Sequence, residues 1–251
     1  GTCTGRWLLK MKVGDVPEFH HAALNDMMRN KANTPTMGGV LIAGSILACT
    51  LLLADLTSFY VQMGMVCLAW RAMLGGVGDW LKLTAQRRKT GSRDGLFTWE
   101  KLVFQFGLAV VLGLFIHHYG QTALSIDFDH MSRMTHSLTL PLAKTWQFDS
   151  EMRRYIPSDD LIVLGAGAFV LVSIFVIAGS SNAVNLTDGM DGLASGIVSV
   201  CAFAFMILAL IAGREDTAKF LLVPYIPLSD ELAIVAGAMA GACLGFLWFN
   251  C

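Results

Sequence analysis

The chain has 251 residues, of which 55% are hydrophobic and only 15% are charged, and its formal net charge is -1. Its mean hydropathy of +0.58 is far above what a water-soluble domain of this length needs. The composition therefore excludes an ordinary soluble domain and places the chain in a lipid bilayer. We expect no nucleic acid among its partners.

A transmembrane helix needs about 20 mostly apolar residues to cross a hydrocarbon core of about 30 Å. Six stretches of this chain meet that requirement. The sequence therefore predicts an all-α, polytopic integral membrane bundle of about six transmembrane helices, folded as a single domain over residues 1–251. The predicted spans cover residues 37–56, 60–78, 102–119, 160–179, 192–212 and 231–249.

The basic residues divide unequally between the two sides of these spans, with eleven on the side of the N-terminus and six on the other. Because cytoplasmic loops carry an excess of Lys and Arg, we expect the N-terminus in the cytoplasm. Residues 1–36, 79–101 and 180–191, together with Asn250 and Cys251, then face the cytoplasm. Only Arg71 is a charged residue in mid-span, so no crossing path for a transported solute is evident.

The first polar motif runs from Lys31 through Thr34-Pro35-Thr36 to Gly39, at the cytoplasmic mouth of the first span. Pro35 holds Thr34 extended, and the glycines allow backbone groups to approach an anionic ligand. An ordinary helix start, with Thr34 as its cap and Pro35 at its first position, explains the same residues. Both interpretations stay open at this point.

The second motif, Gly78-Asp79-Trp80-Leu81-Lys82, ends the second span. Asp79 and Lys82 are three residues apart and share a face of a continuing helix, where they could hold a phosphate and a proton acceptor together. The alternative is an interfacial ion pair in which Lys82 extends to the lipid headgroups.

The third motif gathers two carboxamides and two carboxylates, because Asn182, Asn185, Asp188 and Asp191 lie within ten residues between two apolar runs. A carboxylate beside hydrocarbon costs several kcal/mol or more unless it has a partner. The spacing therefore favours a metal or nucleotide site on a membrane face. A polar loop with Asp188 as the N-cap of the next helix is the structural alternative.

In order, these motifs resemble the phospho-N-acetylmuramoyl-pentapeptide transferase (MraY) family of the polyprenyl-phosphate N-acetylhexosamine-1-phosphate transferase superfamily. The resemblance includes Gly95-Leu96, Lys101-Leu102, Gln105 and Trp248-Phe249-Asn250. It implies transfer of phospho-MurNAc-pentapeptide from UDP-MurNAc-pentapeptide to undecaprenyl phosphate, which gives lipid I and UMP and uses Mg2+. It also implies a multi-pass protein of the bacterial inner (plasma) membrane with a cytoplasmic active face, and a homodimer.

The resemblance assigns catalysis to three carboxylates, Asp79, Asp188 and Asp191. It assigns substrate binding to six polar residues, Lys31, Thr36, Lys82, Asn182, Asn185 and Asn250. Among these, Lys31 and Thr36 resemble residues of the nucleotide site, and Asp79 with Lys82 resembles the part that handles the lipid phosphate. Asn185 resembles a magnesium or diphosphate ligand.

The chain departs from the family pattern at several points. Gly78 replaces the first of two adjacent aspartates, and Asp94 replaces a lysine. The family's first helix would precede Gly1, and its magnesium-binding aspartate and histidine-rich loop would follow Cys251. These departures predict a fragment of a larger bundle that is incomplete as a catalyst.

Two other functions fit the same residues. One is a UDP-GlcNAc polyprenyl-phosphate transferase of the same superfamily, against which the Thr-Pro-Thr-Met-Gly-Gly sequence argues. The other is an inactive paralogue that binds lipid phosphate or serves as a scaffold, for which Gly78 is the best support.

Overall fold

The structure is a computed structural model that describes seven segments of the chain. These are residues 38–88, 98–122, 134–140, 145–150, 154–158, 160–187 and 192–250. Within them, the backbone alone is described at residues 79, 82–88, 98, 122, 154, 249 and 250.

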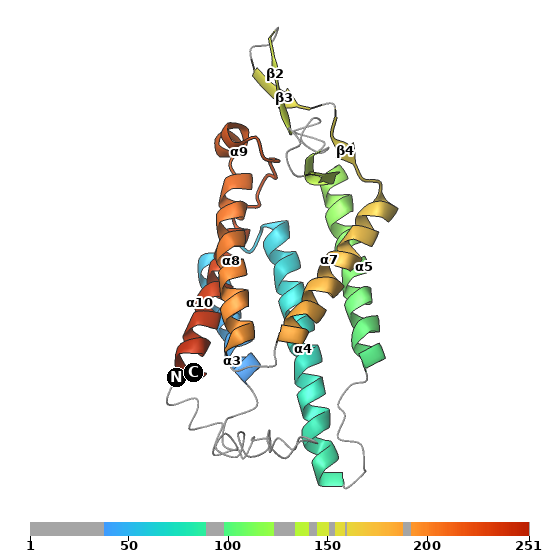
Figure 1. Ribbon diagram of the computed structural model, residues 1–251, viewed down its shortest axis with the longest axis vertical. Helices are drawn as coiled ribbons and strands as arrows, with labels where there is room; N and C mark the ends of the chain where they lie inside the picture. The colour runs from blue at the N-terminus through green and yellow to red at the C-terminus, as the bar shows by residue number, and fades with distance from the viewer. Residues whose placement is uncertain are drawn as a thin grey trace.

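Long helices dominate these segments (Figure 1). In chain order they are α3 (Gly38–Leu53), α4 (Phe59–Arg88), α5 (Thr98–Thr122), α7 (Ala166–Thr187), α8 (Leu193–Ala212), the short α9 (Glu215–Leu221) and α10 (Leu232–Asn250). The prediction of a mostly helical chain is confirmed.

The long helices run up and down between two ends of the molecule (Figure 1). We call one the hairpin end, after the β-hairpin that projects there. We call the other the motif end, because the helix termini next to all the polar motifs lie there: Gly38, Arg88, Thr98, Thr187, Leu193 and Asn250. Segments far apart in the sequence therefore converge on one face.

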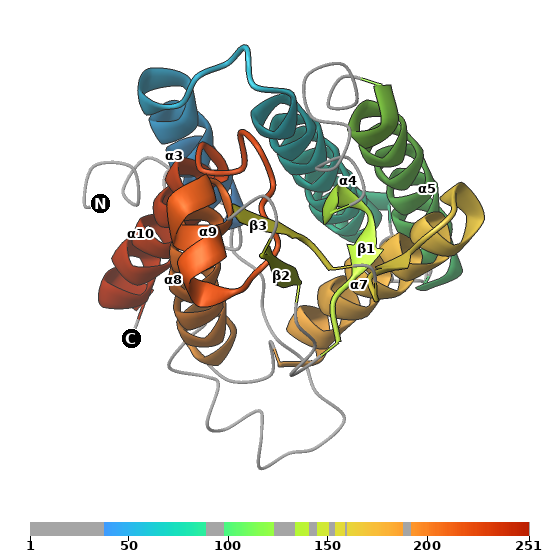
Figure 2. The same ribbon diagram turned by 90° about the horizontal axis from the view of Figure 1, so that it is seen from above.

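The helices form two groups, as the view along the bundle shows (Figure 2). In one group α10 packs on α8 and α3, and in the other α5 packs on α7. Small residues permit the close approaches, since a Cβ on Gly113 of α5 would lie 3.3 Å from the Val170 backbone of α7. Ser199 of α8 donates a 3.3 Å hydrogen bond to the carbonyl of Ala240 in α10.

Three described helices are long and apolar enough to cross a membrane, at Trp99–Gln121, Ala166–Thr187 and Leu193–Ala212. Gly38–Leu53 and Leu232–Trp248 are apolar but shorter. The predicted limits also shift, because the span expected at 160–179 begins only at Ala166 and continues to Thr187. Helix α7 thus carries both asparagines of the third motif on its last turns.

Among the described residues, four short strands lie between the helices at the hairpin end, where the all-α prediction left loops. β1 (Ser137–Leu138) pairs with β4 (Ile162–Val163), and β2 (Trp146–Asp149) pairs antiparallel with β3 (Arg154–Pro157). The Trp146 indole donates a 2.7 Å hydrogen bond to the Val223 carbonyl, which ties the hairpin to the segment after α9.

Candidate functional site

The structure describes only some of the predicted site residues. Four of them, Lys31, Thr36, Asp188 and Asp191, lie outside the described residues. At Asp79, Lys82 and Asn250 the backbone belongs to α4 or α10, while the side chains lie outside the description. Asn182 and Asn185 are described in full on α7.

Asn182 takes part in a hydrogen-bond network that joins α5 to α7. Its amide nitrogen donates to the Gln105 side-chain oxygen at 2.9 Å and to the Ala178 carbonyl at 2.8 Å. The Gln105 amide nitrogen in turn donates to the Ser181 hydroxyl at 3.0 Å. Because Gln105 is only 8% exposed, these bonds satisfy amide groups whose burial would otherwise be costly.

This network fixes the orientation of the Asn182 amide. Both of its N–H groups are used, so its carbonyl oxygen is the atom that remains as an acceptor. Asn185 follows three residues later, one turn nearer the motif end, and is exposed. The last turns of α7 therefore present amide oxygens next to the chain segment that carries Asp188 and Asp191.

The start of α8 rules out one structural explanation of the third motif. The N-cap of α8 is Gly192, and among the described residues this helix has no side-chain cap. Asp188 is therefore not the N-cap, contrary to the structural alternative. Gly192 has φ 79°, a left-handed conformation that a glycine adopts without strain. It directs the chain into α8 immediately after the Asp191 position.

The glycines of the first motif differ in their surroundings. A Cβ on Gly38 would lie 2.5 Å from the Phe246 ring of α10, whereas a Cβ on Gly39 would meet nothing within 4 Å. A side chain at position 38 would force the Phe246 ring to shift, so Gly38 allows α3 to approach α10 closely. Only Gly39 fits the prediction of backbone left free to meet a ligand.

The family models identify the chain. The model of glycosyl transferase family 4 matches residues 63–251, and signature 1 of the phospho-N-acetylmuramoyl-pentapeptide-transferases matches residues 31–42. The chain belongs to glycosyl transferase family 4. The signature covers the first polar motif and the first turns of α3, so the resemblance stated from the motifs is confirmed.

Curated relatives agree with this family assignment. The chain is similar to the phospho-N-acetylmuramoyl-pentapeptide-transferases of Thermodesulfovibrio yellowstonii, at 37% identity, and of Desulfatibacillum aliphaticivorans and Solibacter usitatus, each at 35%. Each match covers 98% of this chain and 59%, 60% and 62% of the respective relative. The chain thus spans about three fifths of the length of these relatives.

Two residues of the network between α5 and α7 have no predicted role in the sequence analysis. Gln105 appeared only as part of the motif pattern, and Ser181 was not singled out. A glutamine within an otherwise apolar span is itself a signal, because an amide in hydrocarbon needs a partner. Its partner could not be identified without knowing that α5 packs on α7.

The described residues include no group of three or more His, Cys, Asp or Glu side chains that could hold a metal ion. The carboxylates predicted beside such an ion belong to the undescribed part of the motif. The structure does describe the amide oxygens of Asn182 and Asn185, and oxygen atoms are the ligands that Mg2+ prefers.

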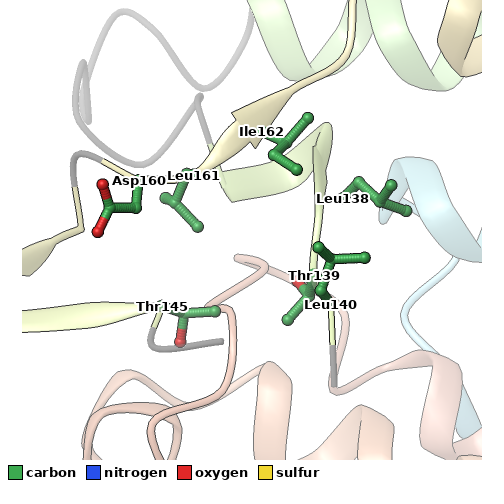
Figure 3. Close-up of a pocket in the computed structure, with 7 residues that line it drawn as sticks. All are labelled: Leu138, Thr139, Leu140, Thr145, Asp160, Leu161 and Ile162. Carbon is green, nitrogen blue, oxygen red and sulfur yellow. The ribbon is translucent and has the colours of Figure 1, made fainter. Parts of the chain in front are cut away.

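A cavity of about 220 Å3 lies at the opposite end of the molecule, between β1, β4 and the base of β2 (Figure 3). Its lining is mainly leucine, isoleucine and threonine, with the Asp160 carboxylate at one side. It is remote from the helix termini that flank the family motifs, so we assign it no part in the site.

Proposed function

We propose that this chain belongs to an enzyme that transfers phospho-MurNAc-pentapeptide from UDP-MurNAc-pentapeptide to undecaprenyl phosphate, with lipid I and UMP as products. The helix termini that flank each motif converge at the motif end, and this convergence is the observation that carries the proposal. Sequence signature 1 of the phospho-N-acetylmuramoyl-pentapeptide-transferases, matched at residues 31–42, supports it.

The reaction exchanges one phosphoanhydride for another. An oxygen of the lipid phosphate attacks the sugar-bearing phosphorus of the nucleotide, a new P–O–P bond forms, and UMP leaves with the electrons of the broken bond. The enzyme must align these oxygens and reduce the repulsion between two anions. We assign nucleotide binding to Lys31 and Thr36, lipid-phosphate binding to Lys82, and further substrate contacts to Asn250.

Asp79, Asp188 and Asp191 are the proposed catalytic carboxylates. In a direct mechanism, a carboxylate beside the lipid phosphate acts as a base that deprotonates it. In a covalent mechanism, the carboxylate acts as a nucleophile. Asn185, with Asn182 behind it, would hold Mg2+ through amide oxygens. The ion, when bound, neutralises phosphate charge. The N-terminus of α8, directly after this motif, also favours an anion there.

We further propose six transmembrane spans in the bacterial inner (plasma) membrane, a cytoplasmic motif end and a homodimer. In this arrangement α3, α4 and α10 cross the bilayer together with the three longer apolar helices. The nucleotide substrate would reach the motif end from the cytoplasm, and the lipid phosphate would reach it from the inner leaflet.

Because we expect this chain to be incomplete as a catalyst by itself, the test is a transfer assay with the membrane-reconstituted full-length protein to which it belongs, labelled UDP-MurNAc-pentapeptide, undecaprenyl phosphate and Mg2+. We expect lipid I and UMP, loss of both on chelation of Mg2+, and a fall of at least about 100-fold for Asp188→Asn, because a catalytic carboxylate contributes on this order. Asp216→Asn is the matched control, since Asp216 is exposed on α9 at the hairpin end.

The same assay separates the alternatives. Product from UDP-GlcNAc, and none from UDP-MurNAc-pentapeptide, would replace this proposal with the related transferase. Lipid-phosphate binding without turnover from either nucleotide would favour the inactive paralogue.

A further inference from the structure

The connection between α8 and α10 carries apolar side chains that the fold leaves uncovered. It runs over residues 213–231 and contains the short helix α9. Phe220 is 85% exposed, the largest value among the large hydrophobic residues that the structure describes. Leu221, Leu222 and Leu228 are also exposed. Four large apolar side chains within nine residues therefore have little contact within the described fold.

Two of these leucines hold an unfavourable backbone conformation. Leu222 has φ 55° and Leu228 has φ 63°, in the left-handed region that costs free energy for any residue with a Cβ. Packing of the leucine side chains would offset this cost, but both side chains are exposed. An apolar environment outside the described fold would offset it instead.

Hydrogen bonds hold the connection at a fixed level of the bundle. The backbone N–H of Ile226 donates to the carbonyl of Ala212, the last residue of α8, at 2.9 Å. The Val223 carbonyl accepts the 2.7 Å hydrogen bond from the Trp146 indole. The connection is thus tied both to the end of α8 and to the base of the β2–β3 hairpin.

This level coincides with the edge of the hydrocarbon core. Helix α8 has 20 residues, which at 1.5 Å per residue span about 30 Å, the thickness of that core. The apolar stretch of α8 ends at Ala212 and that of α10 begins at Leu232, and α9 lies directly at this end of α8 (Figure 1). Lipid is already present at this level, whereas a soluble partner would have to displace the headgroups.

Charged and apolar side chains separate along α9. Glu215 and Asp216 lie in its first turn, and Phe220 and Leu221 end it. The Lys219 ammonium, which pairs with Glu215 at 2.5 Å, also lies 5.5 Å from the centre of the Trp146 ring, so its charge is satisfied within the protein. This order fits a segment whose apolar end enters the headgroup layer.

We propose that the α8–α10 connection is an interfacial anchor, which inserts Phe220, Leu221, Leu222 and Leu228 into the bilayer leaflet on the hairpin side. The lipid contact offsets the cost of the two left-handed leucines. Through the Trp146 hydrogen bond, it also holds the hairpin at a constant height above the membrane. This interaction surface is separate from the motif end and does not depend on the transfer reaction.

The test measures the membrane depth of nitroxide labels on single cysteines, in the full-length protein to which the chain belongs. All native cysteines are replaced by alanine, and the liposomes contain phosphatidylethanolamine and phosphatidylglycerol without any other protein. Molecular oxygen concentrates in hydrocarbon and a nickel chelate stays in water, so the ratio of their collision rates with a label reports its depth.

We expect this ratio to be several-fold higher for labels on Phe220→Cys and Leu228→Cys than for a label on Asp216→Cys. Asp216 is the matched control, because it is exposed one turn before Phe220 on the same face of α9. A label on Gln147→Cys, on the exposed part of the hairpin, should be reached mainly by the chelate. Phe220 is so exposed that its replacement should not disturb folding.

Two results would overturn the proposal. Equal access of the chelate to positions 220 and 216 would place the connection in water. Labels at 220 and 228 that neither reagent reaches would show that another part of the protein or a second copy covers these side chains. The measurement uses no substrate, so inserted labels on a protein without transfer activity would sustain this inference and contradict the transferase alone.

Discussion

Gln105 connects the helix that carries the third motif to the rest of the bundle. Its amide accepts a hydrogen bond from Asn182 and donates one to Ser181. We expect Gln105→Leu to lower the free energy of unfolding by about 1 kcal/mol, since two half-buried polar groups, on Asn182 and Ser181, lose a partner. It should also lower transferase activity, because the Asn182 amide is then free to turn.

Thermal unfolding in detergent and the transfer assay check this prediction. Gln121→Leu is the matched control, because Gln121 is exposed near the other end of α5. Equal effects of the two substitutions would show that the network does not position Asn182.

His136, at the hairpin end, makes the stability of the protein depend on pH. Burial and the neighbouring His117, whose ring centroid is 4.9 Å away, lower the pKa of His136 below its usual value near 6.5. The unfolded chain therefore binds more protons than the folded chain below about pH 6.5. The contribution of His136 to the free energy of unfolding should be fully present above about pH 6.5 and should be lost as the pH falls through the folded-state pKa.

We expect the unfolding temperature to decrease between pH 7.5 and 5.5, and His136→Asn to reduce this dependence. His118→Asn is the control because His118 is exposed. An unfolding temperature that is constant over this range would contradict the prediction.

At the scale of elements, Gly213 determines how α8 turns into the segment before α10. A Cβ on Gly213 would lie less than 3.0 Å from the backbone nitrogen and Cα of Asp230. Gly213→Ala should therefore destabilise the fold by about 1 to 3 kcal/mol through overpacking. Gly241→Ala is the opposite case, because Gly241 is inside α10 with nothing within 4 Å of its Cβ position.

Alanine at position 241 should be neutral or stabilising by up to about 1 kcal/mol, since it favours the helix. Urea or thermal unfolding of the two variants measures the difference. A Gly213→Ala variant as stable as the parent chain would show that the turn relaxes at little cost.

At the scale of the whole molecule, the proposed topology places the hairpin end and the motif end on opposite sides of the membrane. We expect a single cysteine at Gln147, in β2, to react with a membrane-impermeant maleimide in intact spheroplasts. One at Gln86, near the end of α4, should react only after permeabilisation. The six native cysteines are replaced by alanine in both variants, and labelling of both positions from the same side would contradict the topology.

The sequence by itself determined the helical architecture and the family, because apolar runs and short polar motifs are local properties of the chain. It also predicted the chemistry in three separate segments. It missed the strands at the hairpin end, since two to four residues leave little periodicity, and it ended the span before Asn182 because the last turns of α7 are polar. Propensity alone does not show that a helix continues past its apolar run.

Only the tertiary structure decided which polar groups meet. The bonds from Asn182 to Gln105 and from Gln105 to Ser181 cross 77 and 76 residues of sequence, and the packing of α5 on α7 creates them. The position of Gly192 as the N-cap of α8 likewise depends on backbone geometry that residue types alone do not show. Residue types show what a side chain can do, whereas packing determines whether it has a partner within the fold.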